Sequence, residues 1–214
     1  MRHAGNGARK LISLLLLCTS VAAHSWLDCV NFDFANDTCL GYPRSYPGRE
    51  NRDINTIYTY LIDGNPQERP MCDPRRQSRP FYTQKFPMAV AHPGDRLNMV
   101  WEMNGHLNDN KPTYVSIYWI SNDEDHNQQQ PDRNVVPTIG ERIVFATSSN
   151  CDEPSNPNSR CHGSFRLPAN MRSGVHSFVW FWQFDKNPAG EQYTTCFDVH
   201  IMPSGQSQQL ESNS

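Results

Sequence analysis

The chain has 214 residues, with 19 lysines and arginines and 22 aspartates and glutamates, so its formal net charge is −3. This length suits one domain that can bury a sizeable core. The acidic balance argues against a nucleic acid as partner, because proteins that bind nucleic acids carry a basic surface.

The first 23 residues have the pattern of a secretory signal peptide. Three basic residues begin it, namely Arg2, Arg9 and Lys10. An apolar core at residues 11–17 follows, and small residues at 21–23 precede the expected cleavage site. The apolar run is too short to span a bilayer, so we expect a secreted, extracellular protein without a membrane span. Cleavage would leave 16 basic and 22 acidic residues, a net charge of −6.

Cysteine usage agrees with secretion. Cys18 leaves with the leader, and the six cysteines that remain predict three disulfides. Spacing alone leaves their pairing open, although short sequence separations favour Cys29–Cys39 and Cys151–Cys161. Asn36 begins the sequon Asn36-Asp37-Thr38, so we expect N-glycosylation there, consistent with a eukaryotic source.

Short β-strands separated by turn signals dominate the rest of the chain. We expect one domain over residues 24–203 and a polar, disordered tail at 204–214. Residues 24–55 are interpreted as loop, and strands are predicted at 57–62, 86–90, 96–101, 113–120, 142–146, 164–167, 176–184 and 193–202. Trp180 and Trp182 share one face of the most apolar strand and are expected in the core. The pattern predicts an all-β, antiparallel, immunoglobulin- or fibronectin-like sandwich with long loops.

Cleavage after Ala23 would make His24 the first residue of the mature protein. That residue then offers a free α-amino group and two ring nitrogens, and the amine and Nδ1 can close a chelate on one metal ion. Together with a second histidine, they give the planar, nitrogen-rich geometry that Cu(II) favours. The alternative is that His24 is an incidental first residue.

His106 is the best candidate for the second histidine. It follows the strand that ends near Trp101, with Gly105 allowing the backbone to turn, and strand ends and loops carry the sites of β-sandwiches. The other histidines of the mature chain occupy ordinary loop or strand positions: His92, His126, His162, His176 and His200. A lone histidine is more often structural or solvated than a ligand.

Three features in register resemble the lytic polysaccharide monooxygenases, secreted copper enzymes that cleave polysaccharides oxidatively. The first is His24 directly after a signal peptide, and the second is Pro93-Gly94-Asp95 leading through Trp101 to His106. The third is the segment 190–199, which resembles the last strand of that superfamily. The likeness covers nearly the whole mature chain, without assigning a particular family of the superfamily.

The resemblance implies a set of site residues. One copper ion would be held by the α-amino group and Nδ1 of His24 and by Nε2 of His106, with Tyr193 on its axial side. Glu191 stands where cellulose-active fungal members carry a glutamine. In this it resembles bacterial relatives, which have a glutamate next to the copper ligands. The likeness also implies a Cys72–Cys196 disulfide, an external electron donor and a monomer.

The substrate face is expected near His24, with Tyr42 and Tyr46 as candidate platforms on which sugars stack. Arg75 and Arg76 belong to a basic loop that the Cys72 bridge would bring close to this face. If so, they favour an anionic polymer such as pectin, because guanidinium groups pair well with carboxylates. The alternative is a solvated loop on an acidic protein.

Two other functions remain open at this point. A non-catalytic copper-binding or uptake protein on the same scaffold would carry an extra acidic ligand, for which Glu102 and Asp109 are candidates. A cell-wall carbohydrate-binding protein would stack sugars on Tyr42, Tyr46 and Trp26 and need no copper. Tyr193 at the axial position favours the enzyme.

Overall fold

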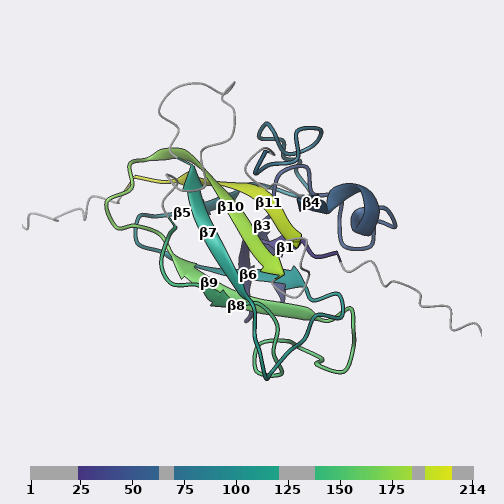
Figure 1. Ribbon diagram of the computed structural model, residues 1–214. Coiled ribbons are helices and arrows are strands. Elements are labelled where there is room, and N and C mark those ends of the chain that lie inside the picture. Colours follow the sequence, from purple (N-terminus) through teal and green to yellow (C-terminus); the bar gives the residue numbers. More distant parts are fainter. Residues whose placement is uncertain (1–23, 63–69, 121–137, 185–190, 204–214) are drawn as a thin grey trace, which may run out of the picture.

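The computed structural model describes residues 24–62, 70–120, 138–184 and 191–203. The expected leader at 1–23 and the expected tail at 204–214 lie outside these described residues, as does His126. The regular secondary structure of the described chain is almost entirely β-strand, arranged in packed sheets (Figure 1), so the prediction of an all-β sandwich is confirmed. None of its helices within the described residues is long and apolar enough to cross a membrane.

The strands, in chain order, are β1 (Leu27–Cys29), β2 (Asn31–Asp33), β3 (Thr38–Gly41), β4 (Tyr60–Ile62), β5 (Ala89–Ala91), β6 (Arg96–Glu102), β7 (Tyr114–Ile120), β8 (Ile143–Val144), β9 (Arg160–Arg166), β10 (Gly174–Phe184) and β11 (Glu191–Ile201). One turn of π-helix, η1 (Ile54–Tyr58), precedes β4.

Two sheets form the body of the fold. The larger has the order β4-β11-β10-β7-β8, and the smaller has the order β1-β6-β9. Neighbouring strands are antiparallel, apart from β5, which pairs with β11 in parallel. The β2–β3 hairpin makes a further two-stranded sheet. The long strands β7, β10 and β11 run side by side in Figure 1.

The main core lies between the two sheets. Successive side chains of a strand point to opposite faces, and Phe178, Trp180 and Trp182 of β10 all point inward and are fully buried. Their partners on β11 include Phe197, opposite Phe178, and Tyr193, opposite Trp182. The expected core role of the two tryptophans is confirmed.

The outer face of β10 and β11 is buried as well. Val179, Phe181 and Cys196 form a second cluster with Met71, which belongs to the loop that follows β4. Because both faces of β10 are covered, its sequence is a continuous apolar run rather than an alternating one.

The described part of the chain contains three disulfides, as predicted. They join Cys29 to Cys39, Cys72 to Cys196 and Cys151 to Cys161, which are the three expected pairs. The Cys72–Cys196 bridge spans 124 residues and ties the loop after β4 to the outer face of β11. The other two bridges each close a short local segment.

The largest differences from the sequence-based prediction fall before residue 62. Residues 24–55, expected to be loop, contain β1, β2 and β3, whose three or four residues are too few to show a periodicity. The strand expected at 57–62 is confined to Tyr60–Ile62. Ile54 and Tyr58 are both buried and lie four residues apart, a helical spacing, and Thr59 donates its backbone N–H to the carbonyl of Ile54 over 3.1 Å.

A buried ion pair fixes the loop after β3 to the outer face of the larger sheet. Arg44 donates from Nε and Nη2 to the two carboxylate oxygens of Asp198 on β11, over 2.8 and 2.5 Å. Tyr82 and Ser177 also donate hydroxyl hydrogen bonds to this carboxylate, over 2.7 and 2.8 Å. Both charged side chains are buried, and the two parallel hydrogen bonds between them are of the strong, charge-assisted kind.

We expect Arg44→Met to lower the free energy of unfolding by about 3–5 kcal/mol, because it leaves the carboxylate of Asp198 buried without its cation. Arg79→Met is the matched control. Arg79 is exposed in the loop after β4, and its loss should change stability by less than about 0.5 kcal/mol. Chemical denaturation measures both, and equal effects would contradict the structural role of the Arg44–Asp198 pair.

Candidate functional site

The chain from His24 to Trp26 runs alongside the end of β6. Glu102 donates its backbone N–H to the carbonyl of Trp26 over 3.1 Å, and the Ser25 hydroxyl donates to the carbonyl of Glu102 over 2.5 Å. The pairing continues into the β1–β6 ladder, where Leu27 stands opposite Trp101. The start of the described chain is therefore fixed against the strand that leads to His106.

A tight turn at the end of β6 leads into His106 and contacts His24. Asn104 and Gly105 both have positive φ, of 44° and 76°, and His106 donates its backbone N–H to the carbonyl of Met103 over 3.1 Å. The Asn104 side-chain amide donates to the carbonyl of His24, and also to the side chain of Asn55 over 3.1 Å. The residue that contacts His24 thus lies two positions before His106.

Aromatic rings form the inner wall of this corner. The His106 ring meets the Trp182 and Phe184 rings edge-on, at centroid distances of 4.8 and 4.5 Å. Trp182 also stacks on Tyr193 at 5.1 Å, and the Tyr193 ring meets the His24 ring at 6.3 Å. Trp182 therefore connects the surroundings of both histidines.

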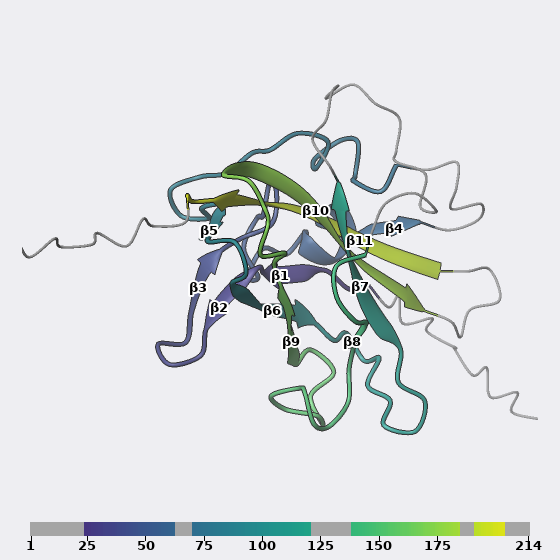
Figure 2. The same cartoon turned by 90° about the vertical axis from the view of Figure 1, so that its left-hand side faces the viewer.

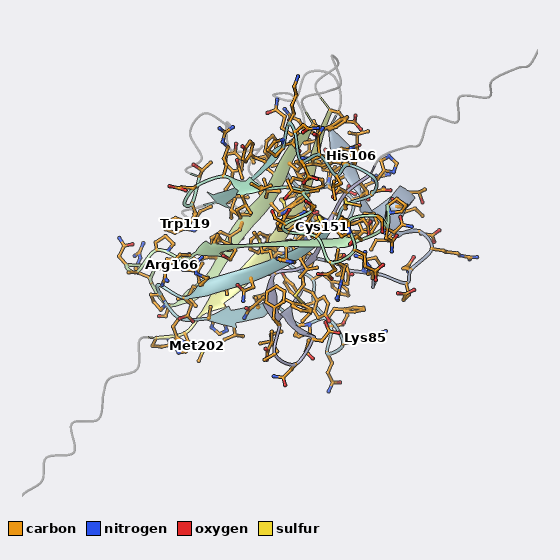
Figure 3. All side chains as sticks on the ribbon, turned by 90° about the horizontal axis from the view of Figure 1, so that it is seen from below. Lys85, His106, Trp119, Cys151, Arg166 and Met202 are labelled. Carbon is orange, nitrogen blue, oxygen red and sulfur yellow. A yellow bond between two sulfur atoms is a disulfide. The ribbon has the colours of Figure 1, made fainter. Side chains whose placement is uncertain are left out.

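Both histidines are half-buried at one end of the molecule, and Nε2 of His106 is itself buried. Figure 3 shows His106 at the opposite end from Met202, which follows β11. The structure thus brings together His24, His106 and Tyr193, which the sequence analysis singled out over a span of 170 residues.

Tyr193 and Glu191 lie on the same face at the start of β11. The Tyr193 hydroxyl donates a hydrogen bond to Oε1 of Glu191, and its ring is fully buried. Burial, followed by the contact with Glu191, raises the pKa of Tyr193 above that of an ordinary tyrosine. The phenol is therefore neutral at physiological pH, with its proton held toward Glu191.

A buried ionic network lies behind the His24 segment. The Arg49 guanidinium contacts a carboxylate oxygen of Asp28 on β1 and one of Glu102 on β6. Glu102 also accepts the backbone N–H of Asn104 over 3.0 Å, which shapes the turn that contacts His24. Asp28 accepts further bonds from the Trp26 indole over 2.8 Å and from the Tyr46 hydroxyl over 2.6 Å.

The sequence analysis did not identify Arg49 or Asn104. Arg49 and its partner Glu102 are 53 residues apart in the sequence. Arg49 belongs to no local motif, so the sequence gives no sign of its role. For Asn104 a signal was present, since Asn104-Gly105 is a typical turn dipeptide. The contact of its side chain with His24 follows from the tertiary fold alone.

The two candidate acidic ligands are engaged elsewhere. Glu102 contacts Arg49 and the backbone of Asn104, while Asp109 accepts from the backbone N–H and hydroxyl of Ser148 over 2.7 and 3.0 Å. Within the described ranges, no group of three or more His, Cys, Asp and Glu side chains is arranged to hold a metal ion. A site made of two histidines and an α-amino group contains only two such side chains.

The prediction that Tyr46 offers a platform for sugar stacking is wrong. Its side chain is 8% exposed, lies in a cluster with Trp26, Ile54 and Tyr58, and donates to buried Asp28. Tyr42 is half-buried and stacks on Tyr46 at 5.3 Å. One face of its ring is therefore covered by the protein, and its role toward a sugar stays a prediction.

The basic loop does not lie on the same face as Tyr193. Arg75 and Arg76 are exposed, as expected. However, Cys196, which anchors their loop, belongs to the outer cluster of β11, whereas Tyr193 belongs to the main core on the opposite face. The bridge from Cys72 therefore places the loop on the outer face of the larger sheet, and its proximity to a substrate face at His24 stays a prediction.

Comparisons with known proteins give one family. A family model described as a domain of unknown function, DUF7492, matches residues 21–130 and 123–214. No curated protein matches the sequence.

Several solved structures match at low similarity. A lytic polysaccharide monooxygenase important for chitin utilisation in Cellvibrio japonicus is 19% identical, over 55% of this chain and 56% of that chain, with a TM-score of 0.33. The AA10 lytic polysaccharide monooxygenase from Streptomyces lividans is 16% identical, over 62% and 65%, with a TM-score of 0.38. Entomopoxvirus fusolin is 14% identical, over 59% and 40%, with a TM-score of 0.39. The chain spans less than two thirds of each, and at these TM-scores the likeness carries no conclusion about it.

We expect Arg49→Met to destabilise the protein by about 3 kcal/mol at neutral pH, because Asp28 and Glu102 then stay buried without their shared cation. Burial raises the pKa of both carboxyl groups, and Arg49 opposes that rise. Without Arg49 the folded-state pKa values rise further, so the folded protein binds protons more readily than the unfolded chain.

The deficit should therefore shrink as the pH falls from neutrality toward about 4, the pKa of an ordinary carboxyl group. Thermal unfolding of the wild type and the variant across this range measures the difference. A deficit that is constant with pH would contradict the network. Arg142→Met, which removes a cation lying over the Tyr114 ring, controls for loss of a surface guanidinium.

Proposed function

We propose that this chain, which belongs to the DUF7492 family of domains of unknown function, is a secreted copper-dependent monooxygenase that cleaves polysaccharides oxidatively. The observation that carries the proposal is the convergence of His24, His106 and Tyr193 at one corner of the sandwich. Trp182 contacts the rings of both His106 and Tyr193, and Asn104 contacts the His24 backbone.

The residues present fit a copper ion. After cleavage behind Ala23, the donors would be the α-amino group and Nδ1 of His24 and Nε2 of His106, and nitrogen donors of this kind suit copper. The Asn104 amide uses the carbonyl oxygen of His24, which is not one of these donors. When bound, copper supplies one-electron chemistry with oxygen species, for which an external electron donor is required.

The neighbouring side chains have separate tasks in this proposal. Tyr193 would lie beside the ion as a neutral phenol, because its raised pKa and its bond to Glu191 disfavour ionisation. Glu191 in turn is positioned as a hydrogen-bond acceptor next to the site. Trp182 and Phe184 exclude water from the inner side of His106.

The contacts of the acidic residues favour an enzyme over a copper carrier. A carrier with an extra carboxylate ligand would draw on Glu102 or Asp109, and both are held by other partners. A sugar-binding protein without copper would use exposed platforms, but Tyr46 is buried. The substrate class in this proposal is a polysaccharide, bound by the surface around His24.

We expect His106→Ala to weaken Cu(II) binding by at least about 10–100-fold, the range already seen when residues outside the ligand set of a metal site are lost. His92→Ala is the matched control, since His92 lies exposed in a turn beside Asp95. One residue added before His24 should be as damaging as His106→Ala, because the amine is then out of reach. Calorimetry and EPR of the mature protein measure these effects, and equal losses for His92 and His106 would refute the assignment.

Activity is tested by incubating the mature, copper-loaded protein with cellulose, chitin, xylan and polygalacturonate, with and without a reductant. We expect oxidised oligosaccharides from at least one polymer, and only when copper and reductant are both present. Tight copper binding without products would identify a carrier, whereas polymer binding without copper binding would identify a carbohydrate-binding protein. A product from polygalacturonate that Arg75→Ala/Arg76→Ala abolishes would support the prediction of an anionic substrate.

A further inference from the structure

The tip of the β2–β3 hairpin has an unusual surface. The closing pair is Asp33 opposite Thr38, and the four residues between them form the turn. Phe34 is 53% exposed at the start of this turn, and Asp37 at its end has a φ of 48°. The hairpin projects from the body of the molecule (Figure 2). The tip therefore presents a large aromatic ring to solvent.

The Phe34 ring is held in place although it is exposed. It meets the Phe32 ring at 5.0 Å and the His162 ring at 5.3 Å, both edge-on. Phe32 is buried, so the contact anchors the exposed ring to the interior. Phe34 is therefore a fixed apolar surface rather than a side chain free to move through solvent.

Asn36, two residues after Phe34, is oriented within the turn. Its Nδ2 donates to Oδ2 of Asp33 over 2.6 Å, while the Thr38 hydroxyl donates to the Asn36 carbonyl over 3.0 Å. The hydrogen bond from Asn36 lowers the pKa of Asp33, so the acceptor is a carboxylate. An amide nitrogen carries two hydrogens, and the bond to Asp33 uses one. The second can be replaced by a substituent while this bond persists.

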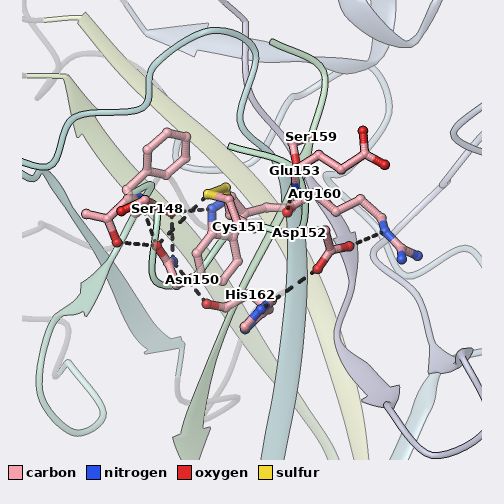
Figure 4. Close-up of a disulfide and its surroundings, with 12 residues drawn as sticks. Ser148, Asn150, Cys151, Asp152, Glu153, Ser159, Arg160 and His162 are labelled. Carbon is pink, nitrogen blue, oxygen red and sulfur yellow. Dashed lines mark hydrogen bonds and ion pairs between the residues drawn. A yellow bond between two sulfur atoms is a disulfide. The ribbon is translucent and has the colours of Figure 1, made fainter. Parts of the chain in front are cut away.

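A surface depression of about 410 Å³ begins at this turn. Phe34 and Asp37, the residues on either side of the Ala35–Asn36 pair, both line it. Its other walls carry Asp152, Glu153, Arg160 and His162. Asp152 accepts from Arg160 over 3.0 Å beside the Cys151–Cys161 bridge, which makes this wall a constrained segment (Figure 4).

We propose that Asn36 carries an N-linked glycan whose first N-acetylglucosamine lies on the Phe34 ring and stabilises the hairpin. The donor is a lipid-diphosphate-linked oligosaccharide in the secretory pathway. Nδ2 of Asn36 bonds to C1 of the sugar, the C1–O bond to the diphosphate breaks, the amide loses one proton, and the lipid diphosphate leaves. The sequon supplies the acceptor, and the structure adds a partner for the sugar.

The chemistry of the depression fits a sugar. The C–H face of a pyranose ring is apolar and covers exposed aromatic surface, which removes part of Phe34 from water. The carboxylates of Asp37 and Asp152 accept from sugar hydroxyls, and Arg160 donates to sugar oxygens. Because the glycan is covalently attached beside the ring, its effective concentration there is high. The inference is independent of copper binding.

The experiment compares four proteins in a double-mutant cycle. Wild type and Phe34→Ala are each produced in a glycosylating eukaryotic host and in a bacterial periplasm, which leaves Asn36 unmodified in the same sequence. Mass spectrometry establishes occupancy. We expect the glycan to raise the Tm of the wild type by about 2–4 °C, the shift that a modest gain of stability gives in a domain of this size. In Phe34→Ala the rise should fall to less than half.

Two further samples test whether the first sugar and the Phe34 ring are responsible for the rise in Tm. Trimming the glycan to its first sugar with an endoglycosidase should preserve the rise in Tm, since only that sugar contacts Phe34. Phe81→Ala removes another exposed ring, 60% accessible, and should leave the rise unchanged. An unmodified Asn36 in the eukaryotic product would overturn the proposal. So would a rise in Tm that is the same with Phe34 and with alanine.

Discussion

One guanidinium shared by two buried carboxylates underlies the candidate site. Arg49 joins Asp28 on β1 to Glu102 on β6, and its charge compensates two groups that burial would otherwise drive toward protonation. Glu102 also accepts the backbone N–H of Asn104, whose side chain contacts the carbonyl of His24. The positions of the first described residues and of the turn before His106 thus depend on this electrostatic arrangement as well as on the backbone bonds to β6.

The other half of the site depends on the larger sheet. Trp182 packs on Phe145 at 3.8 Å, on Tyr193 at 5.1 Å and on His106 at 4.8 Å, and its indole donates to the Thr113 hydroxyl over 2.9 Å. A ring with so many fixed neighbours has little freedom to move. The imidazole of His106 therefore rests against a rigid wall, which limits the reorganisation that ion binding at this corner would require.

The sequence allowed prediction of the parts in which a periodic pattern extends over many residues. The alternation along 113–120 and the apolar run at 176–184 correspond to β7 and to most of β10. The three-residue strands near the start escaped prediction because so few residues carry no periodicity. Residues in motifs, such as His24 and His106, were identified as candidates, whereas Arg49 was not, because its partners are distant in sequence. The face of β11 to which the Cys72 bridge ties the loop of Arg75 could not be predicted, because a disulfide alone does not tell the two faces of a strand apart.

The place of β11 in the larger sheet has a consequence for biogenesis. Among the described strands, β4 and β5 both pair with β11, and β10 forms its longest ladder with it. This strand is nevertheless the last of them to be synthesised. Until it emerges, β4 and β5 lack their partner, and β10 exposes a long apolar edge of the kind that favours association with other chains. Most contacts of this sheet join distant parts of the chain, a topology that folds slowly. Efficient production should therefore depend on chaperones that protect the nascent chain until synthesis is complete.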